Sequence, residues 1–285
     1  MAAALFWACA GLIGRSSPMS GPVLAFWRAL FGAATYQLVL AWRGRRPRLA
    51  DLWTSAAGGI GFGLSIACLF VAYKTTTLIS ANVIACLQPL ALGLFDHRRG
   101  RRLGTVRWAA TAAAVVGTVL VVIGSSAHTG TWSLRGDLFA LAGTVANVGY
   151  VLGTKRARRT MGPLDYQASM LWIAALVTLP VALWSSSGHP VPVARGWWWV
   201  AGLVTIGGTG HLLFSAAQRH VSVAASSAIV LVEVVAVALG AAAVYHQSIG
   251  WLQGVGMVAV SGAVVVWVGR SQETTISVVA GQEAG

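Results

Sequence analysis

The chain has 285 residues, of which 56% are hydrophobic and only 9% are charged, and its mean hydropathy is +0.72. Ordinary soluble domains carry roughly 25% charged residues, so this composition excludes a soluble globule, a disordered chain and a secreted disulfide scaffold. The formal charge of +13 would suit a nucleic-acid-binding protein, but the basic residues stand between long apolar runs. We attribute them to a membrane protein with basic cytoplasmic loops, and we expect the lipid bilayer, and no nucleic acid, as a partner.

Ten apolar runs follow one another, separated by short polar or Pro- and Gly-bearing segments. Most are 19–21 residues long, enough to cross a hydrocarbon core of about 30 Å as a helix. The runs are continuous and do not alternate, which excludes a membrane barrel. They cover residues 2–14, 21–41, 52–72, 75–95, 106–124, 136–154, 164–184, 197–217, 224–243 and 249–269. This pattern predicts an all-α polytopic membrane protein with ten transmembrane helices, the first being short or truncated.

The distribution of Lys and Arg predicts the orientation. With a cytoplasmic N-terminus, 15 of the 20 basic residues fall in inside loops or the tail, four fall outside, and Arg28 lies within a span. An excess of Lys and Arg is typical of cytoplasmic loops. We therefore expect a multi-pass protein of the plasma (inner) membrane with both termini in the cytoplasm. Residues 271–285 are polar and lack periodicity, and we expect them to form a disordered cytoplasmic tail.

The three cysteines, Cys9, Cys68 and Cys86, each lie in an apolar run and have neither metal-site nor disulfide spacing. We interpret them as small core residues and expect no metal or cofactor.

The chain matches itself at one ungapped offset of 145 residues. Each copy holds five runs, and an odd number of spans places the second copy upside down in the membrane. The distribution of basic residues supports this inversion, because the loop at 43–48 is basic and its counterpart at 188–193 has no Lys or Arg. We expect a first repeat at 1–125 and a second at 136–270, with the inverted topology typical of secondary transporters. The matching pairs are Pro18/Pro163, Trp27/Trp172, Pro47/Pro192, Trp53/Trp198, Gly63/Gly208, Gly117/Gly262 and Gly124/Gly269.

Three segments resemble EamA-type members of the drug/metabolite transporter superfamily. They are LAFWRALFGA at 24–33, LQPLALGLF at 87–95 and GWLQGVGMVAVSGAVVVWVG at 250–269. The resemblance extends over essentially the whole chain. It implies a non-enzymatic protein that moves metabolites, amino acids or drugs, often outward.

The chain departs from the family pattern in two places. The Gly-Glu pair usual after the fourth and ninth helices is replaced by Phe-Asp-His at 95–97 and Tyr-His-Gln at 245–247. The ninth helix also lacks a proline, since Pro89 aligns with Val234 at the offset.

Two charged residues lie well inside predicted spans, Arg28 in the second and Glu233 in the ninth. A charge inside a membrane is costly and is usually paired or functional. Glu233 is therefore a candidate proton carrier or cation-site ligand. Two alternatives stay open: a structural Glu233–Arg28 pair and a neutral, hydrogen-bonded glutamic acid.

Polar residues of the fourth and ninth runs align with each other. At the offset, Gln88 aligns with Glu233 and Asn82 with Ser227. Pro89 should kink its helix and free a carbonyl, which can open a polar notch beside a cavity. We expect Asn82, Gln88 and Ser227 to line a cavity, with hydrogen bonding between helices as the alternative.

Four further residues complete the candidate binding set. Trp27 offers a cation–π or stacking face beside Arg28, although anchoring of the helix is equally compatible with its position. Tyr36, Tyr150 and His211 are polar points within spans, and a lone histidine in a span also fits a packing role.

These observations predict a secondary-active transporter that exports a small metabolite, amino acid or drug by alternating access, coupled to an ion gradient, namely protons. We expect it to act as a monomer or a homodimer. No Walker motif is present, so the chain itself should not hydrolyse ATP. One alternative is a non-transporting membrane scaffold or receptor. Another is an intramembrane enzyme acting on lipid-linked substrates, which would need a cluster of acids, histidines or nucleophiles near one interface.

Overall fold

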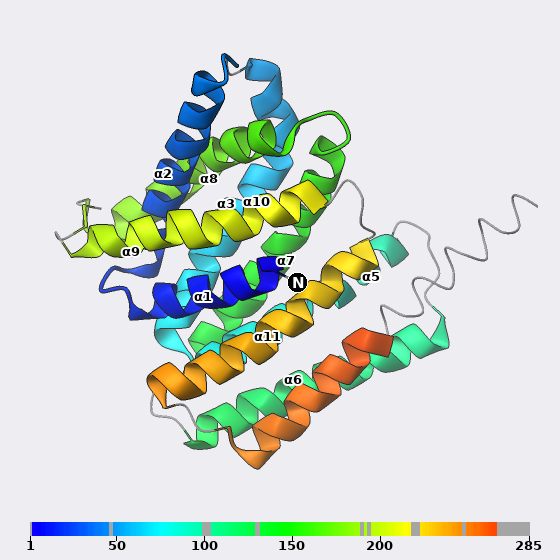
Figure 1. Cartoon of the computed structure of the whole chain (residues 1–285). Coiled ribbons are helices and arrows are strands. Elements are labelled where there is room, and N and C mark those ends of the chain that lie inside the picture. The colour runs from blue at the N-terminus through cyan, green and yellow to red at the C-terminus, as the bar shows by residue number, and fades with distance from the viewer. Residues whose placement is uncertain are drawn as a thin grey trace, which may run out of the picture.

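The computed structural model describes residues 2–45, 48–98, 104–128, 132–188, 191–192, 195–217, 223–246 and 249–266. Every regular element within these ranges is helical (Figure 1). The elements are α1 (Ala2–Ser16), α2 (Gly21–Trp42), α3 (Leu49–Thr75), α4 (Leu78–Ala85), α5 (Gln88–Arg98), α6 (Thr105–His128), α7 (Leu134–Ala157), α8 (Pro163–Ser185), α9 (Gly196–Gly202), the π-helical turn η1 (Leu203–Gly207), α10 (Gly208–Ala217), α11 (Val223–Tyr245) and a last helix, Trp251–Val266.

Helix covers each of the ten predicted runs, and six helical segments are long and apolar enough to cross a membrane. These six are Gly21–Trp42, Leu49–Thr75, Thr105–Ser125, Leu134–Ala157, Pro163–Ser185 and Gly196–Ala217. The segments Ala2–Ser16, Leu78–Leu92, Glu233–Tyr245 and Trp251–Val266 are apolar but shorter in the described part of the chain. The all-helical, membrane-protein class expected from the sequence is therefore confirmed.

The predicted run 75–95 is not one helix. It consists of α4 and α5, separated by a turn at Cys86 and Leu87. Pro89 has no N–H group to bond with the carbonyl of Ala85 four residues earlier, which accounts for the break. α11 begins at Val223, 145 residues after the start of α4 at Leu78, and it runs unbroken to Tyr245 with Val234 at the place of Pro89.

The eighth predicted run also contains an irregularity. α9, η1 and α10 follow one another without a gap, so that one helix passes through a π-helical turn at Leu203–Gly207. Such turns are rare and occur frequently at functional sites. In Figure 1 the three segments form one long rod above α1.

Small residues let the central helices approach closely. α3 packs along α7 and α8, and α2 packs along α8. A Cβ atom added to Gly153 of α7 would lie 2.6 Å from the Cα of Gly58 in α3, which leaves room there for hydrogen alone. Membrane helices lack a hydrophobic drive toward one another, so close contacts of this kind are a main source of their association.

Some helices at equivalent positions of the two copies pack on one another. α2 contacts α8, and α4 contacts α11. α6 and the last helix lie together at one edge of the bundle (Figure 1), where a Cβ added to Gly117 would be 2.9 Å from the carbonyl oxygen of Gly256. Elements far apart in the sequence thus meet in pairs that the 145-residue offset relates.

Tryptophans mark the ends of several helices on the outer surface of the bundle. Trp42, Trp53, Trp184, Trp198 and Trp251 are each at least 76% exposed, and each lies in or near a terminal turn. An indole belongs at the level of the lipid headgroups, where its ring is in lipid and its N–H group meets water. Their placement indicates two interfacial belts.

Polar contacts tie the helices at both ends of the bundle. At one end Arg15 Nη1 donates to the carbonyl oxygens of Tyr73 (2.7 Å) and Thr76 (2.6 Å), and Tyr245 Oη donates to that of Leu12 (2.7 Å). These bonds join α1 to α3 and α11. At the other end Arg45 and Asp165 form a salt bridge of 2.9 Å between the end of α2 and the start of α8, and Arg158 Nε donates to the carbonyl oxygen of Ser215 (2.9 Å).

Candidate functional site

A cavity of about 90 Å³ lies inside the bundle, between helices of both halves of the chain. α1, α2, α3 and α4 contribute lining residues from the first half, and α7, α10 and α11 contribute them from the second. A buried water needs about 10–15 Å³ of such space, so the cavity has room for several waters or one small solute. Its wall combines aromatic rings with a few polar groups, which is the usual make-up of a small-molecule site.

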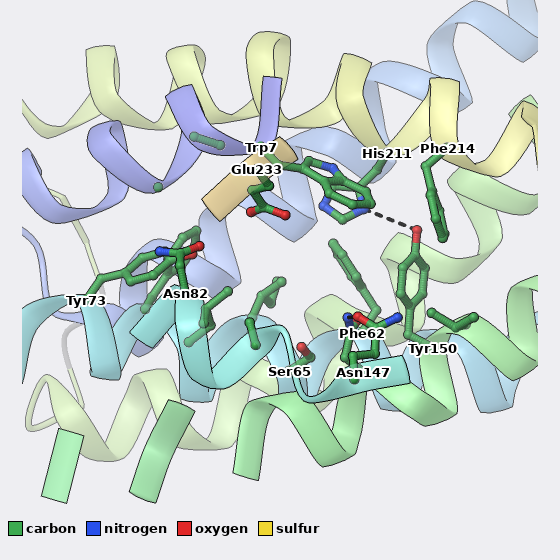
Figure 2. Close-up of a pocket in the computed structure, with 18 of the residues that line it drawn as sticks. Trp7, Phe62, Ser65, Tyr73, Asn82, Asn147, Tyr150, His211, Phe214 and Glu233 are labelled. Atoms are coloured by element: carbon green, nitrogen blue, oxygen red, sulfur yellow. Dashed lines mark hydrogen bonds between the residues drawn. The ribbon is translucent and has the colours of Figure 1, made fainter. Parts of the chain in front are cut away.

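Glu233 projects from α11 into this cavity beside Trp7, as Figure 2 shows. Its side chain is half-buried, and it forms no hydrogen bond or salt bridge with the described residues. The two structural alternatives predicted for it, a salt bridge to Arg28 and a hydrogen-bonded neutral acid, are therefore not formed within the described ranges. The carboxyl group faces the cavity contents instead.

Arg28 projects from α2 and is 6% exposed. Its guanidinium carbon lies 5.4 Å from the ring centre of Phe62 and 5.7 Å from that of Phe70, so two aromatic faces of α3 hold the cation. Arg28 lines the main cavity and also a second, smaller hollow next to it.

Two amides from the broken helix lie on the cavity wall. Asn82 is 2% exposed, and its Nδ2 donates to the carbonyl oxygen of Leu78 at 2.8 Å. Gln88, the first residue of α5, is 7% exposed, and its Oε1 accepts a hydrogen bond of 2.6 Å from Asn147 Nδ2 of α7. The structure thus places both residues at the cavity, and Gln88 also joins two helices. Ser227 lies in α11, but its side chain is outside the described residues.

A tyrosine and a histidine meet across the cavity. Tyr150 Oη and His211 Nδ1 lie 3.1 Å apart and form the hydrogen bond drawn in Figure 2. The His211 ring also packs against Trp7 and Phe62, with ring centres 4.9 Å and 4.8 Å apart. Tyr36 lines the second hollow, where its hydroxyl group donates to the carbonyl oxygen of Gly208 at 2.9 Å.

Among the candidate residues whose side chains the structure describes, Trp27 alone lines neither the main cavity nor the second hollow. It packs against Phe31 and Trp197, with ring centres 5.5 Å and 5.0 Å away. Phe62 and Phe70 are cation–π partners of Arg28.

Sequence reasoning missed several residues of the wall. Trp7, Phe62 and Tyr73 line the cavity from α1 and α3, but their residue types are the same as those that face lipid elsewhere. Gln167 of α8 lines the second hollow and could have been found, because it is a polar residue in the apolar run 164–184. Among the described residues, no three His, Cys, Asp or Glu side chains gather where they could hold a metal ion.

An apolar helical bundle that surrounds a small cavity with a carboxyl group and a guanidinium in its wall is the architecture of a polytopic membrane protein with an internal polar cavity. The EamA-like transporter family model matches residues 1–123 and 134–269, and the chain belongs to that family. One solved crystal structure, 21% identical in sequence, aligns over 93% of each chain with a TM-score of 0.65, which shows a shared fold. No curated protein matches the chain.

Proposed function

We propose that the chain is a secondary-active transporter that exports a small metabolite, amino acid or drug through the central cavity by alternating access, coupled to a proton gradient. The observation that carries this proposal is the free carboxyl group of Glu233 in a cavity lined by both halves of the chain. Membership of a transporter family supports the transport step.

All ten apolar helices cross the plasma (inner) membrane in this proposal, as two inverted five-helix repeats with both termini in the cytoplasm. Two observations support the inverted repeat. α4 and α11 begin 145 residues apart, and two helix pairs that the offset relates, α2 with α8 and α4 with α11, are in contact. The basic loops support the orientation, because they fall on one side under this topology.

The charge of Glu233 couples the movement of the cargo to the movement of a proton. A carboxylate is costly in a closed apolar site, so protonation favours the occluded form that moves between the two open states. When the cavity opens toward the cytoplasm, loss of the proton leaves a charged, hydrated site that binds the cargo again. The proton gradient drives export because the empty, charged site does not close: the carrier crosses in one direction with the cargo bound and returns with the proton bound, so one proton enters for each cargo that leaves.

The test is proton movement in proteoliposomes that contain a pH-sensitive dye, challenged with a panel of amino acids and small drugs. We expect a transported compound to move protons through the wild type and through Asp51→Asn, whose carboxyl group lies in the first turn of α3 outside the cavity. Glu233→Gln should fold and insert but lose this proton movement. Unchanged coupling in Glu233→Gln would remove Glu233 from the mechanism, and no flux of any compound would favour the non-transporting scaffold.

A further inference from the structure

A second hollow of about 10 Å³ lies beside the main cavity, between α2, α3, α8 and the π-helical region. Arg28, Phe62 and His211 line both spaces, so the two spaces adjoin. Tyr36, Gln167 and the backbone at Gly208 complete the polar part of the small hollow. It has room for about one water-sized group.

Gln167 is unusual among the buried polar residues around this hollow. Its side chain is 0% exposed, and neither Nε2 nor Oε1 has a hydrogen-bond partner. Buried amides are almost always hydrogen-bonded, because an unpaired one has lost its water without replacement. The two orphaned atoms therefore indicate a polar occupant of the hollow.

Arg28 adds a positive charge to the lining of this hollow. Its guanidinium is buried, and it forms neither a salt bridge nor a hydrogen bond with the described residues. Stacking on Phe62 and Phe70 fixes the group without using its five N–H donors. A buried arginine with free donors is complementary to an anion.

We propose that Arg28 and Gln167 form an anion subsite that takes a carboxylate group of the cargo, whose remainder lies in the main cavity. This assignment rests on the proposed transport function, because a cargo is what a transporter carries. Binding of a carboxylate at Arg28 and Gln167 can nevertheless be measured without transport. The planar fork of a guanidinium matches the two oxygens of a carboxylate, and the amide N–H of Gln167 supplies a further donor. The small hollow takes one carboxylate oxygen beside Gln167, and the rest of the group lies where the two spaces adjoin at Arg28. A phosphate brings a second negative charge into this buried place, and the single guanidinium does not compensate it.

The test measures binding affinity by isothermal titration calorimetry of the purified full-length protein. The three probes have similar shapes: phenylacetate, its neutral analogue phenylacetamide, and phenyl phosphate. We expect phenylacetate to bind and the other two to bind at least about tenfold more weakly. Phenylacetamide lacks the negative charge, and phenyl phosphate carries a second charge that one buried guanidinium does not compensate. Arg28→Lys, which keeps the charge but loses the fork, should weaken phenylacetate binding about tenfold.

Gln167→Leu should weaken phenylacetate binding by about threefold to tenfold, since it removes one donor from the subsite. Gln253→Leu is the matched control, because Gln253 is equally buried but donates to Ser125 Oγ at 2.7 Å, away from both hollows. This control should leave the affinity within about twofold of the wild type. An unchanged affinity in Gln167→Leu would instead mean that the hollow holds one water.

Equal binding of phenylacetamide, tighter binding of phenyl phosphate, or no binding of phenylacetate would each overturn the carboxylate subsite. Failure of the subsite is distinct from failure of the transport function. Protein that couples protons to other compounds but does not bind phenylacetate contradicts the subsite alone. Protein that binds phenylacetate but transports nothing contradicts the transport function alone.

Discussion

Asp137 shows how one side chain can join three parts of this bundle. It lies in the first turn of α7, is 4% exposed, and accepts hydrogen bonds from Thr76 Oγ1 and Ser80 Oγ, both at 2.8 Å, and from Trp132 Nε1 at 2.7 Å. The carboxylate also lies at the positive end of the α7 dipole. It therefore fastens the α3–α4 turn to the start of α7.

Asp137→Ala should destabilise the protein by about 3 kcal/mol or more, because it leaves three hydrogen-bond donors unpaired in a buried place. Thermal unfolding in detergent measures this as a large drop in the apparent melting temperature. Asp51→Ala removes a half-buried carboxylate from the equivalent turn of α3 and should change stability by less than about 1 kcal/mol. Equal effects of the two substitutions would contradict the role given to Asp137.

The directions and contacts of single side chains could be predicted from the sequence only in part. The rarity of charge inside apolar runs was enough to identify Arg28 and Glu233 as candidates. The sequence could not show which of Trp27 and Arg28 lines the cavity, because the direction of a side chain depends on how its helix is rotated against its neighbours. No sequence signal indicates the role of Asp137, since its three donors come from sequence positions 76, 80 and 132.

At the scale of the element, glycine contacts set the distance between α3 and α7. Gly149 and Gly153 occupy the same helix one turn apart, but their surroundings differ. A Cβ on Gly153 would lie 2.6 Å from the Cα of Gly58, whereas a Cβ on Gly149 would lie 3.7 Å from the Cα of Gly61. The first contact is with backbone that cannot rotate away, and the second is ordinary van der Waals contact.

Gly153→Ala should therefore lower stability by about 2 kcal/mol or more through overpacking. Gly149→Ala should be neutral or raise stability by up to about 1 kcal/mol, because alanine is the better helix former. The ratio of folded to aggregated protein on heating, followed for both variants in the same detergent, checks this. A loss of the same size in both variants would contradict the close approach at Gly153 as its cause, and a gain in both would show that helix propensity outweighs that approach.

The elements themselves could be predicted well from the sequence. Hydrophobic length located helix in all ten runs, and Pro89 indicated the place where the fourth run breaks. The π-helical turn at Leu203–Gly207 had no such signal, because its residues are compatible with a regular helix and the extra residue per turn is a matter of packing.

At the scale of the whole molecule, the 145-residue repeat organises the site. The cavity lies where helices of the two copies meet, and residues of both copies line it. Sequence alone predicted the duplication from seven matching pairs. It could not predict the second hollow, which exists because α2, α8 and the π-helical region come together around Gln167.

The central claim is that the cavity opens in turn to both sides of the membrane. The most direct measurement uses a single cysteine in place of Ser65, a cavity residue that is 6% exposed, in a variant whose Cys9, Cys68 and Cys86 are replaced by alanine. A membrane-impermeant thiol reagent is added to one side of the membrane at a time. Val258→Cys, at a position 74% exposed on the outer face of the bundle, is the control that lipid should protect from either side.

Alternating access predicts that the cysteine at position 65 reacts with reagent from each side, and that a transported compound slows both reactions. Reaction from one side only, under every condition of pH and added compound, would contradict it.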